Sequence, residues 1–181
     1  MFWTRLVVSL AEFGLALGLS IFVVFWSYRS FARFNADAFD AEKEILRGNV
    51  AVSVLMASLT FAAALVMQET IYPVVSILRL GLTAPGGPAG YGLLLLFAYA
   101  AGHLLLGFLL SVGTVEVALR LFETLNREID EQSEIAKGNV AVAVIMGAVV
   151  LIVAMFMQQG VGSVSKSLIP QPKLGALRVM D

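Results

Sequence analysis

Four long runs of apolar residues constrain the fold of this chain more than any other feature. We read them as Leu6 to Tyr28, Val50 to Tyr72, Gly92 to Val115 and Val140 to Gly162. Each approaches or exceeds the roughly 20 residues that a helix needs to cross a bilayer core of about 30 Å. The sequence is 59% hydrophobic and 14% charged, whereas soluble domains have roughly 45 to 50% apolar and about 25% charged residues. We therefore predict an all-α membrane protein with four transmembrane helices.

The second and fourth runs begin with similar sequences. ILRGNVAVSVLMA at residues 45 to 57 is followed 90 positions later by IAKGNVAVAVIMG at residues 135 to 147. Aligning residue n with n+90 from Glu44 to Ile71 gives twelve identities in 28 positions. Chance matching of apolar helices would not be expected to align Glu, Gly, Asn and Gln as well, so we interpret the chain as an internal repeat.

The repeat predicts two helical hairpins. We expect a first two-span repeat at residues 1–81, a Gly/Pro linker at 82–92, a second two-span repeat at 93–163 and a polar tail at 164–181. The linker, LTAPGGPAGYG, is rich in residues that do not continue a helix. Since each unit has two spans, both copies enter the membrane from the same side, and the repeat is parallel rather than inverted.

Charged segments at residues 27–49 and 118–139 join the two spans of each repeat. They contain no Pro and pair acids with bases at helical spacings. The pairs are Asp40 with Lys43, Glu44 with Arg47, Glu123 with Arg127 and Glu134 with Lys137. We expect both segments to be helical extensions of the preceding spans. Their side of the membrane has seven Lys and Arg residues and the other side has five, so the positive-inside rule predicts cytoplasmic charged segments and external termini.

The repeated Gly-Asn pairs, Gly48 with Asn49 and Gly138 with Asn139, have two interpretations. In the first, Asn caps the helix that follows and Gly forms the sharp turn before it. In the second, the helix continues through Asn49, whose side chain then shares a face with later residues. That face has Met56, Thr60 and Met67 in the first copy and Met146 and Met157 in the second.

A stripe of small residues runs beside this face. Small residues let membrane helices approach closely, where packing holds them together. We predict helix contacts at Gly48, Ala57 and Ala64 in the first copy and at Gly138, Gly147 and Ala154 in the second. The second and fourth spans would then form the packed centre of the domain.

Several ionisable residues lie within or next to the spans. At a spacing of 91, which aligns Arg29, Phe31 and Asn35 with Arg120, Phe122 and Asn126, Glu12 matches His103. These two are a candidate proton or cation site, since ionisable groups in spans usually face a partner or water. The alternative is that Glu12 reaches the interface and His103 is a packing residue. Glu44 and Glu134 could likewise form a negative mouth for cations, or be solvated helix ends paired with bases.

The sequence gives little support for an enzyme, a metal- or cofactor-binding protein, or a nucleic-acid-binding protein. Cysteine is absent, and none of the common catalytic, phosphate-binding or metal-binding motifs occurs. We therefore expect no enzyme activity, no cofactor and no metal. The net charge of −1 and the scattered basic residues argue against nucleic-acid binding.

The doubled pattern Glu-Ile-x-x-Gly-Asn-Val-Ala-Val, at Glu44 to Val52 and Glu134 to Val142, resembles the bacterial membrane proteins of the domain of unknown function 350 family. That family typically carries its domain as a tandem repeat of two-span units. The resemblance covers nearly the whole chain up to Ser163. It implies a location in the bacterial inner membrane and no particular activity.

Two functional hypotheses follow from the sequence. The first is an oligomeric ion channel or transporter that uses Asn49, Asn139, Glu44 and Glu134, together with Glu12 and His103. The second is a structural or adaptor subunit that presents its charged helices to a cytoplasmic protein partner, in envelope organisation or stress response. Both place the chain in the lipid bilayer. The small-residue faces predict a homo-oligomer.

Overall fold

The computed structural model describes residues 2–36, 38–83, 93–125 and 130–168, which form helices and no strand. The elements are α1 (Phe2–Phe34), α2 (Ala41–Leu46), α3 (Val50–Met67), the 3₁₀ helix η1 (Gln68–Thr70), α4 (Ile71–Thr83), α6 (Leu93–Leu125), α7 (Glu131–Ala136) and α8 (Val140–Ser167). Four segments are long and apolar enough to cross a membrane: Leu6–Arg33, Val50–Ile77, Leu94–Leu125 and Val140–Ser167. The predicted all-α class with four membrane-spanning helices is confirmed.

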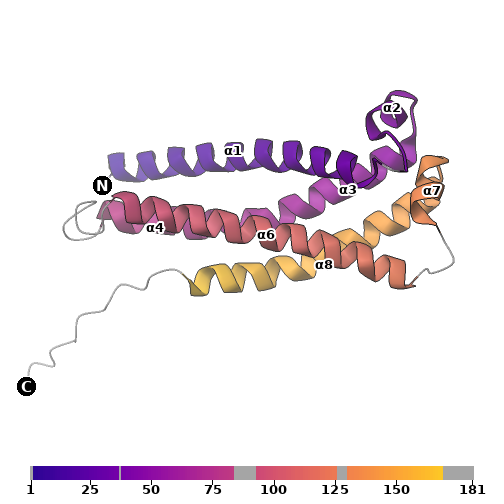
Figure 1. Ribbon diagram of the computed structural model, residues 1–181. Coiled ribbons are helices and arrows are strands. Elements are labelled where there is room, and N and C mark those ends of the chain that lie inside the picture. The colour runs from indigo at the N-terminus through magenta and orange to yellow at the C-terminus, as the bar shows by residue number, and fades with distance from the viewer. Residues whose placement is uncertain (1, 37, 84–92, 126–129, 169–181) are drawn as a thin grey trace, which may run out of the picture.

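The long helices run side by side, and the short helices α2 and α7 lie together at one end (Figure 1). The start of α1 and the end of α4 lie at the other end (Figure 1). We call these the α2–α7 end and the opposite end. The most extensive packing is between α3 and α8, and α6 packs on both, while α1 contacts α3 and α4. The second and fourth predicted spans therefore form the centre of the bundle, as expected.

Buried alanines let the central helices approach closely. One cluster of buried apolar residues lies near the α2–α7 end and includes Phe31, Phe122 and Ile135. A second, farther along the bundle, is built from Ala62, Val66, Ala118, Val150, Ala154 and Val161. Lipid tails are as apolar as these side chains, so close packing rather than exclusion from water holds such helices together.

The helix α3 does not end at Tyr72 but passes through η1 into α4. Pro73 explains the change at η1, since proline has no backbone N–H to donate to the carbonyl four residues earlier, that of Glu69. A short 3₁₀ turn over Gln68–Thr70 accommodates the break. The chain then continues as α4, and α3, η1 and α4 together are longer than the predicted span.

The charged segments differ in part from the expected continuous helices. The helices do extend beyond the predicted spans, α1 to Phe34 and α6 to Leu125. Each charged segment, however, includes a separate short helix, α2 or α7. Asp40 and Asp130 cap these helices from extended backbone, and each side chain accepts the backbone N–H three residues on. An N-cap of this kind begins a new helix and so interrupts the old one.

The predicted linker and tail lie mostly outside the described residues. Leu82 and Thr83, at the start of the linker, belong to α4, and residues 84–92 are not described. The helix α8 continues past the predicted boundary at residue 163 as far as Ser167, and residues 169–181 of the tail are not described.

Candidate functional site

The Gly-Asn pairs form two turns of the same geometry at the α2–α7 end. Gly48 and Gly138 have φ of +82° and +86°, the left-handed region that favours glycine. Asn49 and Asn139 are the N-caps of α3 and α8, with extended backbone. The capping interpretation is therefore confirmed, and the helices do not continue through the asparagines.

Asn49 also bonds across the bundle. Its side-chain nitrogen donates to the carbonyl oxygens of Ile135 and Ala136 in α7, at 3.1 and 3.2 Å. It also donates to Glu44 Oε2 at 3.1 Å. The equivalent Asn139 donates to Glu134 Oε2 at 2.8 Å, a contact within its own turn. The first turn thus connects α3 to α7, whereas the second serves α8 alone.

The two repeated carboxylates are paired with local bases. Glu44 lies 2.8 Å from Arg47 and Glu134 lies 2.9 Å from Lys137. The hydrogen bond from Asn49 lowers the pKa of Glu44, with Arg47 contributing. Asn139, then Lys137, lower the pKa of Glu134 in the same way. Both carboxylates therefore stay ionised with local partners. Two further predicted ion pairs have different outcomes: Asp40 lies 3.0 Å from Lys43, and Arg127 is not among the described residues.

The small-residue stripe behaves differently in the two copies. Gly147 and Ala154 are buried, and a β-carbon at Gly147 would lie 2.5 Å from Ser58 Oγ. Ala57 and Ala64 are exposed. The stripe contacts other helices only in the second copy, because α3 turns a neighbouring face, with Ala62 and Val66, toward α8 and α6.

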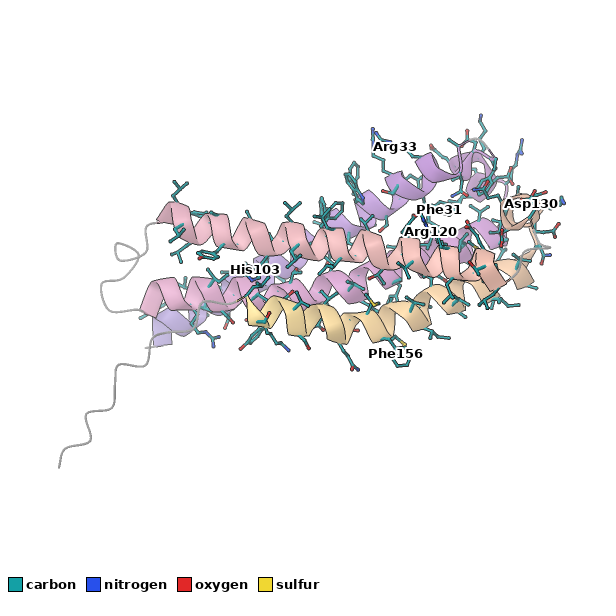
Figure 2. The ribbon with its side chains drawn as sticks, turned by 60° about the horizontal axis from the view of Figure 1, so that its bottom comes forward. Phe31, Arg33, His103, Arg120, Asp130 and Phe156 are labelled. Atoms are coloured by element: carbon teal, nitrogen blue, oxygen red, sulfur yellow. The ribbon has the colours of Figure 1, made fainter. Side chains whose placement is uncertain are left out.

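The structure describes no contact between Glu12 and His103. Glu12 is exposed on α1, which has only slight burial. His103 on α6 is buried, and its Nδ1 donates to the carbonyl oxygen of Tyr99 at 2.9 Å. Its Nε2 is buried and has no hydrogen-bond partner among the described residues. It lies beside a hollow of about 370 Å³ that Leu106 and Leu168 also line. His103 lies well along α6 from the α2–α7 end, where Asp130 is found (Figure 2).

Sequence reasoning overlooked the carboxylate of Glu69. Gln158 Nε2 in α8 donates to Glu69 Oε1 at 3.0 Å, and a β-carbon at Gly162 would lie 2.5 Å from Glu69 Oε2. The repeat aligns Glu69 with Gln159, so comparing the copies gave no signal. The carboxyl group directly before Thr70 in an apolar run was the available clue.

A cavity of about 230 Å³ lies between α1, α3 and α6 and reaches α7. The part of the cavity away from α7 is mostly apolar, although Ser27, Ser30 and Ser111 also line the cavity, and it contains three aromatic rings that contact one another. Trp26 and Phe22 of α1 are 5.0 and 5.5 Å from Phe108 of α6, measured between ring centroids, in edge-to-face geometry. Both rings on α1 remain partly exposed, so the aromatic part of the cavity lies at the surface of the bundle.

The other part of the cavity, at the α2–α7 end, is acidic. Glu116, Glu123 and Glu131 line it. Arg120 pairs with Glu116 at 2.8 Å. Within the described residues, Glu131 Oε1 is buried and receives no hydrogen bond. A buried carboxylate oxygen without a donor is costly, and such a group in a cavity is a candidate binding position.

Metal binding finds no support in the described part of the chain, where no three His, Asp or Glu side chains are placed to share an ion. The cavity lining offers carboxylates, which attract positive charge, and aromatic rings, which contact apolar groups.

Comparison with known proteins adds one decisive finding. The family model described as Domain of Unknown Function (DUF350) matches residues 1–161. The chain belongs to the DUF350 family. This confirms the resemblance based on the doubled Gly-Asn pattern. Neither the curated proteins nor the solved structures contain a match to this DUF350 chain.

Proposed function

We propose that this DUF350 protein is a small multi-pass transport protein of the bacterial inner membrane, and that it takes up cations through the cavity between α1, α3 and α6. The observation that supports this function is that one cavity contains both a mostly apolar wall and Glu131 Oε1, a buried carboxylate oxygen that accepts no hydrogen bond from the described residues. The proposal keeps the transporter hypothesis but moves its site away from the Gly-Asn turns.

The electrostatics of the cavity favour a positive substrate. Within the described residues, Glu116 has an ion pair with Arg120, whereas no ion pair includes Glu123 or Glu131. Two carboxylates at the mouth of a low-dielectric cavity concentrate cations there. With the charged segments in the cytoplasm, as the distribution of Lys and Arg predicts, the acidic mouth would face the cytoplasmic side.

Cation uptake into liposomes tests this function. Purified protein is reconstituted, and uptake of K⁺ and tetramethylammonium is measured against protein-free liposomes. We expect uptake of at least one cation above the protein-free rate, and a strong reduction in the double variant Glu123→Gln with Glu131→Gln. Glu42→Gln is the matched control, because Glu42 is exposed on α2 and does not line the cavity. Uptake at the protein-free rate for both cations would refute the proposal.

A second function is supported by a different observation, an exposed leucine on α2. Leu46 is 81% exposed between the charged side chains of Lys43 and Arg47. Protein interfaces combine apolar contacts with a polar rim, and the charged side chains around Leu46 would supply the rim of such a contact. An adaptor that presents α2 to a cytoplasmic protein would lose that partner in Leu46→Asp. The equivalent variant of the second copy, Ala136→Asp, is the control. Equal copurification of partners with both variants would exclude this surface.

A further inference from the structure

The cavity is elongated, with chemically different ends. Phe108 and Glu123 both line it and are 15 residues apart on α6, which corresponds to roughly 22 Å at about 1.5 Å per residue. The aromatic end has Trp26, Phe22 and Phe108, whose rings contact one another. The acidic end has Glu123 and Glu131 near α7. A ligand that occupies the whole cavity must therefore be apolar at one end and polar at the other.

The charged residues that line the cavity decide the sign of the charge on the ligand's polar end. Arg120 pairs with Glu116 on the same helix, and the described part of the cavity lining contains no other charged group than the three carboxylates. An anionic head would be repelled, and a neutral head would leave the buried Glu131 Oε1 without a charged partner. An inorganic cation would satisfy the carboxylates but would leave the aromatic end unused.

We propose that this cavity binds amphiphilic cations, molecules with an ammonium head and an apolar chain. The head lies between Glu123 and Glu131, and the chain lies against Trp26 and Phe108. This inference rests on the proposed function, since it names the substrate class for the same cavity. A membrane lipid with an amine head and a free amphiphilic amine share this chemistry.

The two tryptophans of the chain allow a direct binding measurement. In the Trp3→Phe background, Trp26 is the single tryptophan and lies in the aromatic end of the cavity. The probe is (12-bromododecyl)trimethylammonium, whose chain is long enough to reach from the acidic end toward Trp26 and whose terminal bromine quenches tryptophan on contact. Its matched controls are 12-bromododecanol, which lacks the charge, and 12-bromododecanoate, which reverses it. All three are titrated onto protein in micelles of dodecyl maltoside, a detergent without an amine.

We expect saturable quenching by the ammonium probe and only weak, linear quenching by the alcohol and the carboxylate. Dodecyltrimethylammonium without bromine should restore the fluorescence by competition. Glu131→Gln should weaken the probe roughly tenfold, as expected for loss of an interaction with a charged group, whereas Glu42→Gln should leave it unchanged. Equal quenching by all three probes, or no competition, would overturn the proposal without the use of any variant.

Two further measurements distinguish a lipid from a free cation as the ligand, and binding from transport. Phosphatidylethanolamine that displaces the probe when added to the micelles identifies a lipid amine as an occupant. Saturable quenching that this lipid does not reduce supports a free amphiphilic cation instead. Saturable quenching without flux in liposomes would support the binding site and contradict transport. Flux of K⁺ without saturable quenching would support transport and overturn this substrate class.

Discussion

Asn49 has more hydrogen-bond partners than Asn139, although both follow glycine and both cap a helix. Asn49 accepts the backbone N–H groups of Ala51 and Val52 and donates to two carbonyl groups of α7. Asn139 accepts from Val142 and donates to Glu134. The same residue type thus stabilises one helix in the second copy and a contact between two helices in the first.

We expect Asn49→Ala to be more destabilising than Asn139→Ala. Loss of either cap costs about 0.5 to 2 kcal/mol. Asn49→Ala also removes the donor to Ile135 and Ala136, at about 0.5 to 1.5 kcal/mol for each hydrogen bond. Unfolding of both variants by sodium dodecyl sulfate, followed by circular dichroism, gives the comparison. A larger effect of Asn139→Ala would contradict the role assigned to the first turn.

Glu44 and Glu134 accept hydrogen bonds from the capping residues Asn49 and Asn139. These two carboxylates predict how the stability of the fold depends on pH. Their hydrogen bonds hold the pKa values of Glu44 and Glu134 below the ordinary 4.5. A carboxyl with a lowered pKa in the folded state stabilises the fold above its unfolded pKa, and this stabilisation is lost as pH falls through the folded pKa.

The thermal midpoint should therefore stay constant above the ordinary carboxyl range and decrease as pH falls below 4.5. In Glu44→Gln with Glu134→Gln the decrease should be smaller. It should not vanish, because a hydrogen bond from Lys43 also lowers the pKa of Asp40. The measurement is a thermal unfolding series over pH. An unchanged decrease in the double variant would show that these two groups do not cause it.

At the scale of elements, three glycines allow side chains of α3 and η1 to enter the surfaces of α6 and α8. Gly147 accommodates Ser58, Gly162 accommodates Glu69, and Gly107 accommodates Thr70. Thr70 is fully buried, and its hydroxyl donates to the carbonyl oxygen of Met67 at 2.7 Å. The 3₁₀ turn before Pro73 is thus packed into its neighbours rather than free to move.

Gly107→Ala tests this packing. The added methyl group would overlap Thr70 Cγ2, and overpacking of this kind costs roughly 1 to 3 kcal/mol. Gly113→Ala on the same helix is the control, because no atom lies near its β-carbon position and alanine gains up to about 1 kcal/mol of helix propensity. Unfolding in detergent should give opposite signs for the two variants. Equal effects would contradict the close contact of η1 with α6.

At the scale of the whole molecule, much of the bundle surface has no protein contact. Only 11% of the apolar window of the span Leu6–Arg33 is buried. Ala57 and Ala64 are exposed on α3, and Phe156 of α8 points away from the bundle (Figure 2). Lipid covers such surfaces in a monomer. A row of small residues is also a surface on which a second copy can pack closely.

We propose a homo-oligomer that uses the exposed Ala57 and Ala64, and expect Ala57→Leu with Ala64→Leu to weaken it. Leucine at these positions would separate packed helices but would be harmless facing lipid. Ala148→Leu, at another exposed position on α8, is the control. Chemical crosslinking in native membranes gives the oligomeric state. Monomer alone in the unsubstituted protein would refute the assembly.

The sequence alone was sufficient for features that depend on neighbours within a few residues. The four spans follow from run length, and the ion pair of Glu44 with Arg47 follows from helical spacing. The Gly-Asn pattern left two interpretations open, and the structure decided for caps at Asn49 and Asn139. A span is decided by one continuous run of residues, and an ion pair of this kind is decided within one helical turn. The sequence pattern already contains what determines them.

Only the tertiary structure decided which helix faces meet. It placed Gly147 in a contact and left the equivalent Ala57 exposed. It also paired Glu69 with Gln158 and formed the cavity near Glu131. The physical reason is that these helices are apolar on nearly every face and lipid is equally apolar. Hydrophobic periodicity therefore does not set their rotation, which is decided by close packing and a few hydrogen bonds between distant residues.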